Sequence, residues 1–362
     1  MNKTKISAKI VADSTSPQGD RLISLVLTYP RIIHAEMMTH RMFSRNASSS
    51  RAVPVDKMIK AVKENTFCPF EFQKSHKGMQ GSEYFTGIER QECINLWLES
   101  AELALQQAEK MKAKGISKQI INRILEPYQY YTILITGSRE GWENFFSLRM
   151  PEYHLENVPT VNEDLSLNSK TLTLIGKSKK ELLKQINEID NDSYTGFKNI
   201  VNSYSDLDWL KINKGQAEIH MMMLSEEIYD CIQESTPVQL KECEWHIPMI
   251  SDLESLKLST YDQIKLSVGR AANTSYTVVG DGKELTLEHA IKIHDKCVEL
   301  VHSSVFEHCA RAMSDEEYKV FIKGKNIGTI VPYLFDDTSK GWCNNLKGFI
   351  PYRYFIDNKI EI

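Results

Sequence analysis

The 362-residue sequence lacks the features of membrane-spanning and disulfide-stapled proteins. No apolar run approaches the roughly 18 residues of a membrane span, and the first residues do not form the apolar stretch of a signal peptide. The seven cysteines are scattered and odd in number, with no CxxC pair and no zinc-type spacing. We therefore expect free thiols in a reducing cytoplasm.

The sequence also lacks a strong excess of either charge. It has 44 Lys and Arg against 48 Asp and Glu, a formal net charge of −4. This balance argues against a protein dedicated to coating nucleic acid, although it leaves room for a local basic pocket. There is no internal repeat and no low-complexity tract, and the length suits about two domains, or one domain with insertions.

Hydrophobic periodicity predicts both strands and helices. Runs of β-branched and aromatic residues predict strands at 21–28 and 130–136. Helices are predicted over 31–44, 55–64, 88–114, 117–126, 139–149, 216–232, 261–272 and 286–301. Residues 150–214 are rich in Asn, Asp, Lys and Ser and carry one predicted helix at 179–189, which indicates an insertion or a long excursion.

The first informative segment is 40–51. It holds three arginines, a histidine, an amide and four serine hydroxyls. Forked cationic donors mixed with short neutral donors are what phosphate recognition requires. A solvated polar loop that caps the next helix would have the same composition, and composition alone leaves both interpretations open.

Further candidate residues follow later in the chain. Arg123 precedes a strand and Arg149 ends an aromatic-rich helix, so each is either an anion ligand or an ordinary surface arginine. His302, Glu307 and His308 lie close together, which raises the question of a metal site. Their spacing is not that of HExxH and a third ligand is not evident, so a polar pocket wall is favoured.

Taken together, these segments resemble the flavin-dependent thymidylate synthases. The family's Arg-His-Arg, Ser, Asn-Glu-x-Ser and Arg-Tyr signature is similar to residues 39–52. Its other motifs are Arg-x-x-Leu-Pro, Asn-x-x-x-x-Arg with Ala-Gln-x-Glu-Ile, Ala-Arg-x-Ser-Tyr and His-x-Ser/Thr-Pro-Phe-Glu-His. They resemble the segments 123–127, 144–149 with 215–219, 272–276 and 302–308.

The order of these motifs differs from that of the family, because the last two precede the Arg-His-Arg motif there and follow it here. The chain therefore resembles a circular permutant, like long proteins of large phages, and permutation is feasible because domain termini often lie close together. The resemblance implies an α+β fold with a mainly antiparallel sheet flanked by helices. It further implies a catalytic core at 1–149 and 215–310, an insertion at 150–214 and a C-terminal extension at 311–362.

The resemblance also implies roles for individual residues. The residues expected to hold FAD are Thr39, His40, Arg41, Ser44, Asn46, Asn144, Ser275, His302, Ser304 and Glu307. Those expected to hold dUMP are Glu36, Ser49, Ser50, Arg51, Arg123 and Arg149. Arg51 and Arg149 are expected to act in catalysis, and no metal is expected.

The implied reaction is reductive methylation of dUMP at C5 to give dTMP. Methylenetetrahydrofolate supplies the carbon and NADPH reduces the FAD, in a cytoplasmic homotetramer without a nucleic-acid or membrane partner. Thr39, Ala47 and Asn273 replace family residues, and Glu36 stands where a glutamine is common. These departures keep open a hydroxymethylase of the same fold that acts on dUMP or dCMP, and a non-catalytic flavin- or nucleotide-binding module.

The C-terminal tail allows two interpretations. The tail segments 341–342 and 352–354 either cover the folate or nicotinamide site or form a packing strand. The implied flavin chemistry requires none of the seven cysteines, so we expect cysteine-to-alanine changes to spare catalysis.

Overall fold

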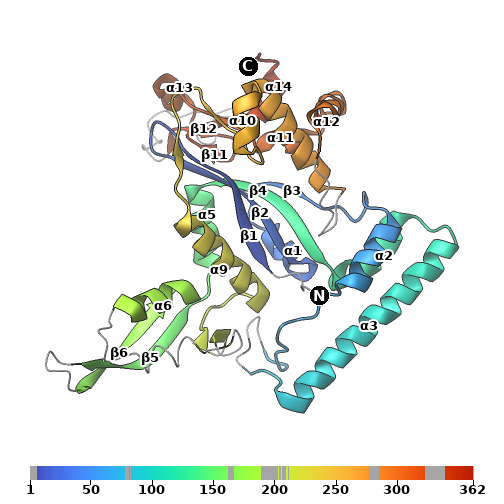
Figure 1. The fold of residues 1–362 in the computed structure, drawn as a ribbon, viewed down its shortest axis with the longest axis vertical. Helices are drawn as coiled ribbons and strands as arrows, with labels where there is room; N and C mark the ends of the chain where they lie inside the picture. Colours follow the sequence, from blue (N-terminus) through green and yellow to red (C-terminus); the bar gives the residue numbers. More distant parts are fainter. Residues whose placement is uncertain are drawn as a thin grey trace. The chain divides into compact units, whose positions relative to one another are not determined.

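The computed structural model describes residues 6–77, 81, 83–161, 167–188, 203, 205, 209–210, 212–276, 285–322 and 339–361 (Figure 1). The chain divides into two compact units, each described here by itself. Unit 1 comprises Met1–Phe67, Leu98–Glu143 and Ser235–Ile362. Unit 2 comprises Cys68–Trp97 and Asn144–Glu234. The four-part division implied by the resemblance stays a prediction.

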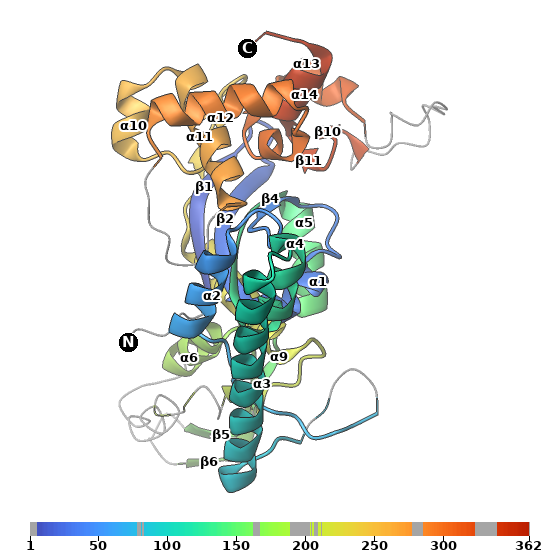
Figure 2. The same ribbon diagram turned by 90° about the vertical axis from the view of Figure 1, so that its right-hand side faces the viewer.

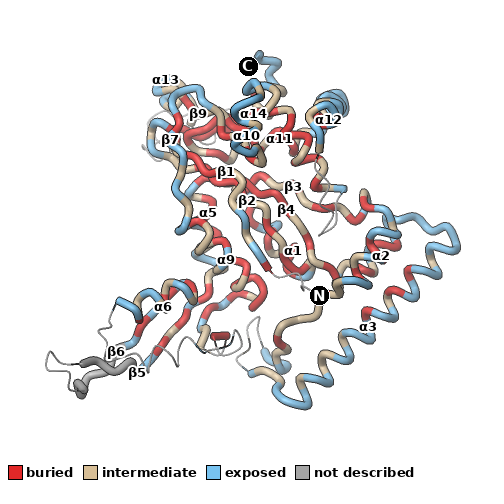
Figure 3. The backbone as a smooth tube through the Cα atoms, viewed as in Figure 1, coloured by how far each residue is buried: buried red, intermediate tan, exposed pale blue. Residues whose placement is uncertain are grey.

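Unit 1 is built on a five-stranded sheet in the order β3-β4-β2-β1-β7. Its strands are β1 (Ser7–Thr15), β2 (Arg21–Pro30), β3 (Ser44–Ala47), β4 (Tyr130–Ser138) and β7 (Val238–Gln239). All neighbours are antiparallel except β1 and β7. Strands β2 and β4 pair from Leu22 with Ser138 to Pro30 with Tyr130, and both are largely buried (Figure 3). The predicted fold class, antiparallel sheet flanked by helices, is confirmed, as are the strands expected at 21–28 and 130–136.

A second layer of unit 1 packs helices on short strands. The helices are α10 (Asp252–Lys257), α11 (Thr260–Thr274), α12 (Leu287–Glu299), η4 (Ser303–Glu307), α13 (Asp315–Val320) and α14 (Tyr352–Asn358). The strands are β8 (Trp245–His246), β9 (Ala310–Ala312), β10 (Trp342–Cys343), β11 (Leu346–Lys347) and β12 (Phe349–Pro351). Helices α11 and α12 lie side by side (Figure 2), and a Cβ on Gly269 would stand 2.7 Å from the backbone of Ala290.

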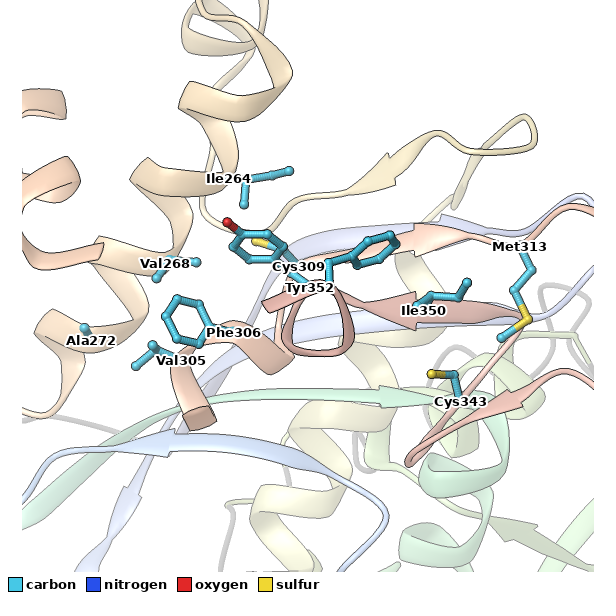
Figure 4. Packing of buried hydrophobic residues seen from close by; sticks show 11 residues of the cluster. Ile264, Val268, Ala272, Val305, Phe306, Cys309, Met313, Cys343, Ile350 and Tyr352 are labelled. Atoms are coloured by element: carbon cyan, nitrogen blue, oxygen red, sulfur yellow. The ribbon is translucent and has the colours of Figure 1, made fainter. Parts of the chain in front are cut away.

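One hydrophobic cluster joins this layer. It draws side chains from α11, η4, β12 and α14, with Phe306 and Tyr352 among its largest members (Figure 4). Tyr352 also bonds through its hydroxyl to Nε2 of His294 on α12, at 3.1 Å. The C-terminal helix is therefore anchored in the core rather than laid on the surface.

A separate cluster of unit 1 buries the face of α2 (Val55–Glu64). Its partners are the later part of α3 (Gly87–Ala113), α4 (Lys118–Ile121) and η2 (Asn122–Tyr128). The helices predicted over 55–64 and 88–114 are confirmed. In the part of the chain that the structure describes, no helix is long and apolar enough to cross a membrane.

Unit 2 holds a hairpin of β5 (Tyr153–Val161) and β6 (Leu167–Gly176), followed by α6 (Lys179–Glu188) and α9 (Ile219–Glu234). Helix α5 (Arg139–Arg149) begins in unit 1 and ends in unit 2. In the core of unit 2, the rings of Trp209 and Tyr153 meet edge to face, with centroids 5.8 Å apart. The helix expected at 179–189 is confirmed, whereas the hairpin was not predicted, because Pro159 and the polar residues of β5 weaken the strand pattern.

The helix predicted over 31–44 is wrong. Residues 31–37 form only η1 (Arg31–Ile33) and α1 (His34–Met37), and the chain then turns into β3. The Thr39 hydroxyl donates to the Glu36 carbonyl oxygen at 2.7 Å, so a side chain satisfies a helix-end acceptor and the helix stops. The following residues gain more by pairing with β4, a non-local contact that local periodicity does not contain.

Candidate functional site

A pocket of about 460 Å³ lies in unit 1 and brings together three segments distant in sequence. Two are motif segments, 40–51 and 302–308, and the third belongs to the C-terminal tail. Its lining residues are Arg41, Phe43, Arg45, Glu307, Asn344, Asn345, Arg353 and Asp357. The pocket is mainly polar and rich in arginine, which suits an anionic ligand.

Strand β3 forms the first wall. Successive side chains of a strand point to opposite faces, so Ser44 and Asn46 are buried while Arg45 is half-buried at the pocket. The Arg45 guanidinium donates to the carbonyl oxygen of Met38 at 2.8 Å. Burial lowers the pKa of Arg45 from its ordinary value and the nearby Glu307 carboxylate opposes that shift; an arginine nevertheless stays charged at neutral pH.

The second wall is an ion pair between η4 and α14. Nη1 of Arg353 lies 2.5 Å from the Glu307 carboxylate, and its Nε donates to Asp357 at 3.2 Å. Arg353 and Asp357 are four residues apart on α14 and therefore share a helix face. Pro351 precedes this helix in an extended conformation and sets its start.

The third wall is the turn between β10 and β11. Asn344 has a positive φ of 55°, which asparagine tolerates better than most residues. The Asn345 amide donates to the carbonyl oxygen of Met42 and to Oγ of Ser44, both at 3.1 Å. Two hydrogen bonds thus fix the tail to the beginning of β3.

Behind the pocket, Asn46 and His308 are joined in the core. The Asn46 amide nitrogen faces Nε2 of His308 at 3.2 Å and the carbonyl oxygens of Ser304 and Arg45 at 3.1 Å each, an orientation assigned from the groups around it. With Nε2 accepting, Nδ1 of His308 donates to Oγ1 of Thr136 at 2.9 Å. Burial lowers the pKa of His308 to about 3, so its ring is neutral.

The hydrogen-bond chain continues across the sheet. Thr136 donates to Oγ of Ser24 at 2.6 Å, and Ser24 donates to Nε2 of His246 at 2.8 Å. Nδ1 of His246 then donates to Ser14 at 2.9 Å. Burial lowers the pKa of His246 to about 4. From Thr136 to His246, every group both donates and accepts, so the buried polar atoms are satisfied.

Most residues implied by the resemblance lie in unit 1. Arg41 and Glu307 line the pocket, His40, Ser44 and Asn46 are buried, and Thr39 and His302 are exposed. The backbone N–H of Ser49 donates to the carbonyl oxygen of Ser275 at 3.0 Å, which joins two of the motifs.

The candidate phosphate arginines lie on a neighbouring part of unit 1. Arg51 is exposed, and the carbonyl oxygens of Ser50 and Val53 accept from the Asn122 amide at 2.7 and 2.9 Å. Asn122 thereby ties the loop of Arg51 to the segment of Arg123. Asn144 and Arg149 belong to unit 2, so the structure does not relate them to the residues of unit 1.

Several pocket residues were not among the sequence candidates. They are Phe43, Arg45, Asn344, Asn345, Arg353 and Asp357. Phe43 and Arg45 stand inside the segment already singled out, so its composition was the signal. The tail residues had only the weak signal of an aromatic run around residue 353. Of that run, Tyr352 is core while Arg353 faces the pocket.

Two observations concern metal ligands and buried thiols among the residues that the structure describes. These residues contain no group of three or more His, Cys, Asp or Glu side chains that could hold a metal ion. Burial raises the pKa values of Cys309 and Cys343 to about 12, so both thiols stay protonated at neutral pH.

The chain is similar to known proteins over part of its length. The family model of the stage IV sporulation protein A middle domain matches residues 147–296, less than half of the chain. No curated protein matches. Two solved structures of the UMP/dUMP methylase PolB from Streptomyces cacaoi, with 5-Br dUMP or 5-Br UMP bound, have a TM-score of 0.33 at 12% and 15% identity. Each match covers 54% of this chain and 96% of that chain.

Proposed function

We propose that the protein is an FAD-dependent methyltransferase that converts dUMP to dTMP, with methylenetetrahydrofolate and NADPH as co-substrates. The observation that carries the proposal is the pocket itself. It unites the arginine segment 40–51 with the segment 302–308, the two segments in which the resemblance places the flavin. We also propose a cytoplasmic homotetramer.

The donor set of the pocket fits the phosphate groups of FAD. Arg41 and Arg45 offer guanidinium groups and Asn344 offers an amide. When bound, the flavin supplies the redox and one-carbon chemistry, and the protein's part is to bind and orient. His302, exposed next to η4, is a further residue proposed to hold the flavin.

The residues proposed for dUMP act by charge and position. Arg51 and Arg123 would hold the phosphate and fix the ring, and Arg149 would stabilise negative charge that develops on the uracil carbonyl. No carboxylate in the described ranges pairs with Arg51, so its guanidinium is available to a phosphate. The scheme requires no protein nucleophile.

A second candidate is hydroxymethylation of dUMP or dCMP by the same site. Glu36 favours it, because a carboxylate only accepts hydrogen bonds and therefore suits the exocyclic amino group of cytosine. A third candidate, a non-catalytic flavin- or nucleotide-binding module, would bind the same ligands without turnover.

Ligand titrations of the purified protein test the proposal. Bound flavin is followed by its visible absorbance and dUMP by calorimetry. Arg41→Ala and His302→Ala should weaken flavin retention, whereas Arg51→Ala and Arg149→Ala should weaken dUMP binding about tenfold or more with FAD retained. Arg139→Ala, at an exposed arginine that starts α5, is the control. A protein that stays colourless with FAD would contradict the proposal.

A further inference from the structure

The C-terminal segment 339–361 is a fixed part of the pocket rather than a cover laid over it. Ile350 and Tyr352 are buried in the core cluster (Figure 4), as is Phe355, and β12 pairs with β9. Arg353 follows Tyr352 directly, and its side chain is 38% exposed at the pocket. An arginine on an anchored helix keeps its position when a ligand arrives, which is the condition for a preorganised binding group.

The hydrogen bonds of Arg353 leave the Nη2 edge of its guanidinium available. Nε is engaged by Asp357 and Nη1 by Glu307. Nη2 has no hydrogen-bond partner among the residues that the structure describes. The two carboxylates therefore orient the group and leave both N–H donors of Nη2 for a ligand.

The charges of the pocket point to an anion. Three guanidinium groups, of Arg41, Arg45 and Arg353, face two carboxylates, and both carboxylates bond to Arg353. Arg41 has no ion pair with any described carboxylate, and Arg45 donates to a backbone carbonyl. Three guanidinium groups against two carboxylates leave the lining with one net positive charge, which favours an anionic ligand.

We propose that Arg353 is a phosphate-binding residue, and that the C-terminal segment completes an anion site with Arg41 and Arg45. The ligand class is a phosphate or diphosphate group, which takes forked hydrogen bonds from arginine. The inference rests on the proposed function only in naming the molecule that carries this phosphate group. That molecule is a dinucleotide such as FAD, through its diphosphate, or dUMP, through its monophosphate.

The test measures binding of inorganic pyrophosphate, FAD and dUMP by calorimetry to the full chain. Arg353→Ala should lower pyrophosphate affinity at least about tenfold, and Arg353→Lys, which keeps the charge but loses the fork, should lower it less. Arg311→Ala is the matched control, because Arg311 is also paired with a carboxylate, Glu317, but lies outside the pocket. Thermal melting of each variant verifies that it is folded.

The ligands distinguish the outcomes. A loss for FAD alone assigns the site to the dinucleotide, and a loss for dUMP alone assigns it to the nucleotide substrate. Pyrophosphate binding that depends on Arg353, without methylation of dUMP, would support the site and overturn the proposed function. Methylation with all three affinities unchanged in Arg353→Ala would overturn the site and leave the function intact. A wild-type protein that binds none of the three would overturn both.

Discussion

The side chains of Asn46 and His308 are hydrogen-bonded to each other in the core, 3.2 Å apart. Their chain neighbours Arg45 and Glu307 both line the pocket. Asn46 belongs to β3 and His308 follows η4, so this pair sets the spacing between two pocket walls. The buried Asn46–His308 pair thus positions the side chains of Arg45 and Glu307 at the pocket.

Replacing His308 should therefore affect stability and binding together. His308→Ala removes one hydrogen-bond partner from each of the buried Asn46 and Thr136 side chains and leaves a cavity, so the free energy of unfolding should fall by roughly 3 kcal/mol. His289→Ala, on the exposed face of α12, should change it by less than about 0.5 kcal/mol. Denaturant unfolding measures both, and equal values for the two variants would refute the role given to His308.

The buried histidines predict a loss of stability in acid. Burial holds the pKa of His246 at about 4 and that of His308 at about 3, against an ordinary value of 6.5. The unfolded chain therefore binds more protons than the folded one below about pH 6.5. The free energy of unfolding is therefore highest above this pH. It falls by up to about 1.4 kcal/mol per pH unit for each histidine as the pH drops toward 4.

Unfolding free energies measured from neutral pH down to about pH 5 test this slope. His308→Ala should show a shallower slope than the wild type, because one titrating group has been removed. A wild-type stability that stays flat over this range would contradict the neutral state of both rings.

The backbone conformation of Val301 predicts that replacing this residue with glycine raises the stability of the protein. It ends α12 in a left-handed conformation with φ of 53°, and the N–H groups of Val301 and His302 bond back to Val298 and Cys297. This is the position where helices favour glycine, since a β-branched residue is strained there. Val301→Gly should stabilise the protein by about 1 kcal/mol.

The same variant tests whether this strained helix end orients His302. Flavin affinity should fall while the melting temperature rises, because glycine frees the segment just before His302. Val298→Gly, inside the same helix, should instead lower stability. A Val301→Gly protein less stable than the wild type would contradict the assigned backbone conformation.

Glu226 predicts the opposite pH dependence in unit 2. Burial raises its pKa to about 7, although the Tyr153 hydroxyl and the Lys179 N–H each donate to its carboxylate at 2.6 Å. The folded state then holds a proton that the unfolded state has lost, so local stability falls by up to about 3 kcal/mol as the pH rises from 4.5 to 7.

Amide hydrogen exchange in α6 and α9 measures this local stability. After correction for the intrinsic exchange rate, Glu226→Gln should abolish the decline in protection with rising pH. Glu227→Gln, at the exposed neighbour, should retain it. A decline that persists in Glu226→Gln would assign the effect to another group.

Sequence patterns predicted the long strands β2 and β4 because each is a continuous run of β-branched, aliphatic and aromatic residues. They failed for 31–44, where the mixture of apolar and basic residues fits a helix but Ser44–Ala47 is held by pairing with β4. The pocket likewise has residues that the sequence indicated and residues that it did not. The composition of the segments 40–51 and 302–308 indicates a binding site, whereas Arg353 is brought to them by non-local contacts. These include the β9–β12 pairing and the Asn345 hydrogen bonds to residues about 300 positions away.

The most direct test of the account is the mass of the product formed from dUMP. The purified protein is incubated with FAD, methylenetetrahydrofolate, NADPH and dUMP, and in parallel with dCMP. We expect dUMP to gain the mass of one CH₂ group, the product to carry a methyl group at C5, and dCMP to be unchanged. Gain of a CH₂O group, or turnover of dCMP alone, would identify the hydroxymethylase instead, and an unchanged dUMP in the presence of bound FAD would contradict the proposed methyltransferase.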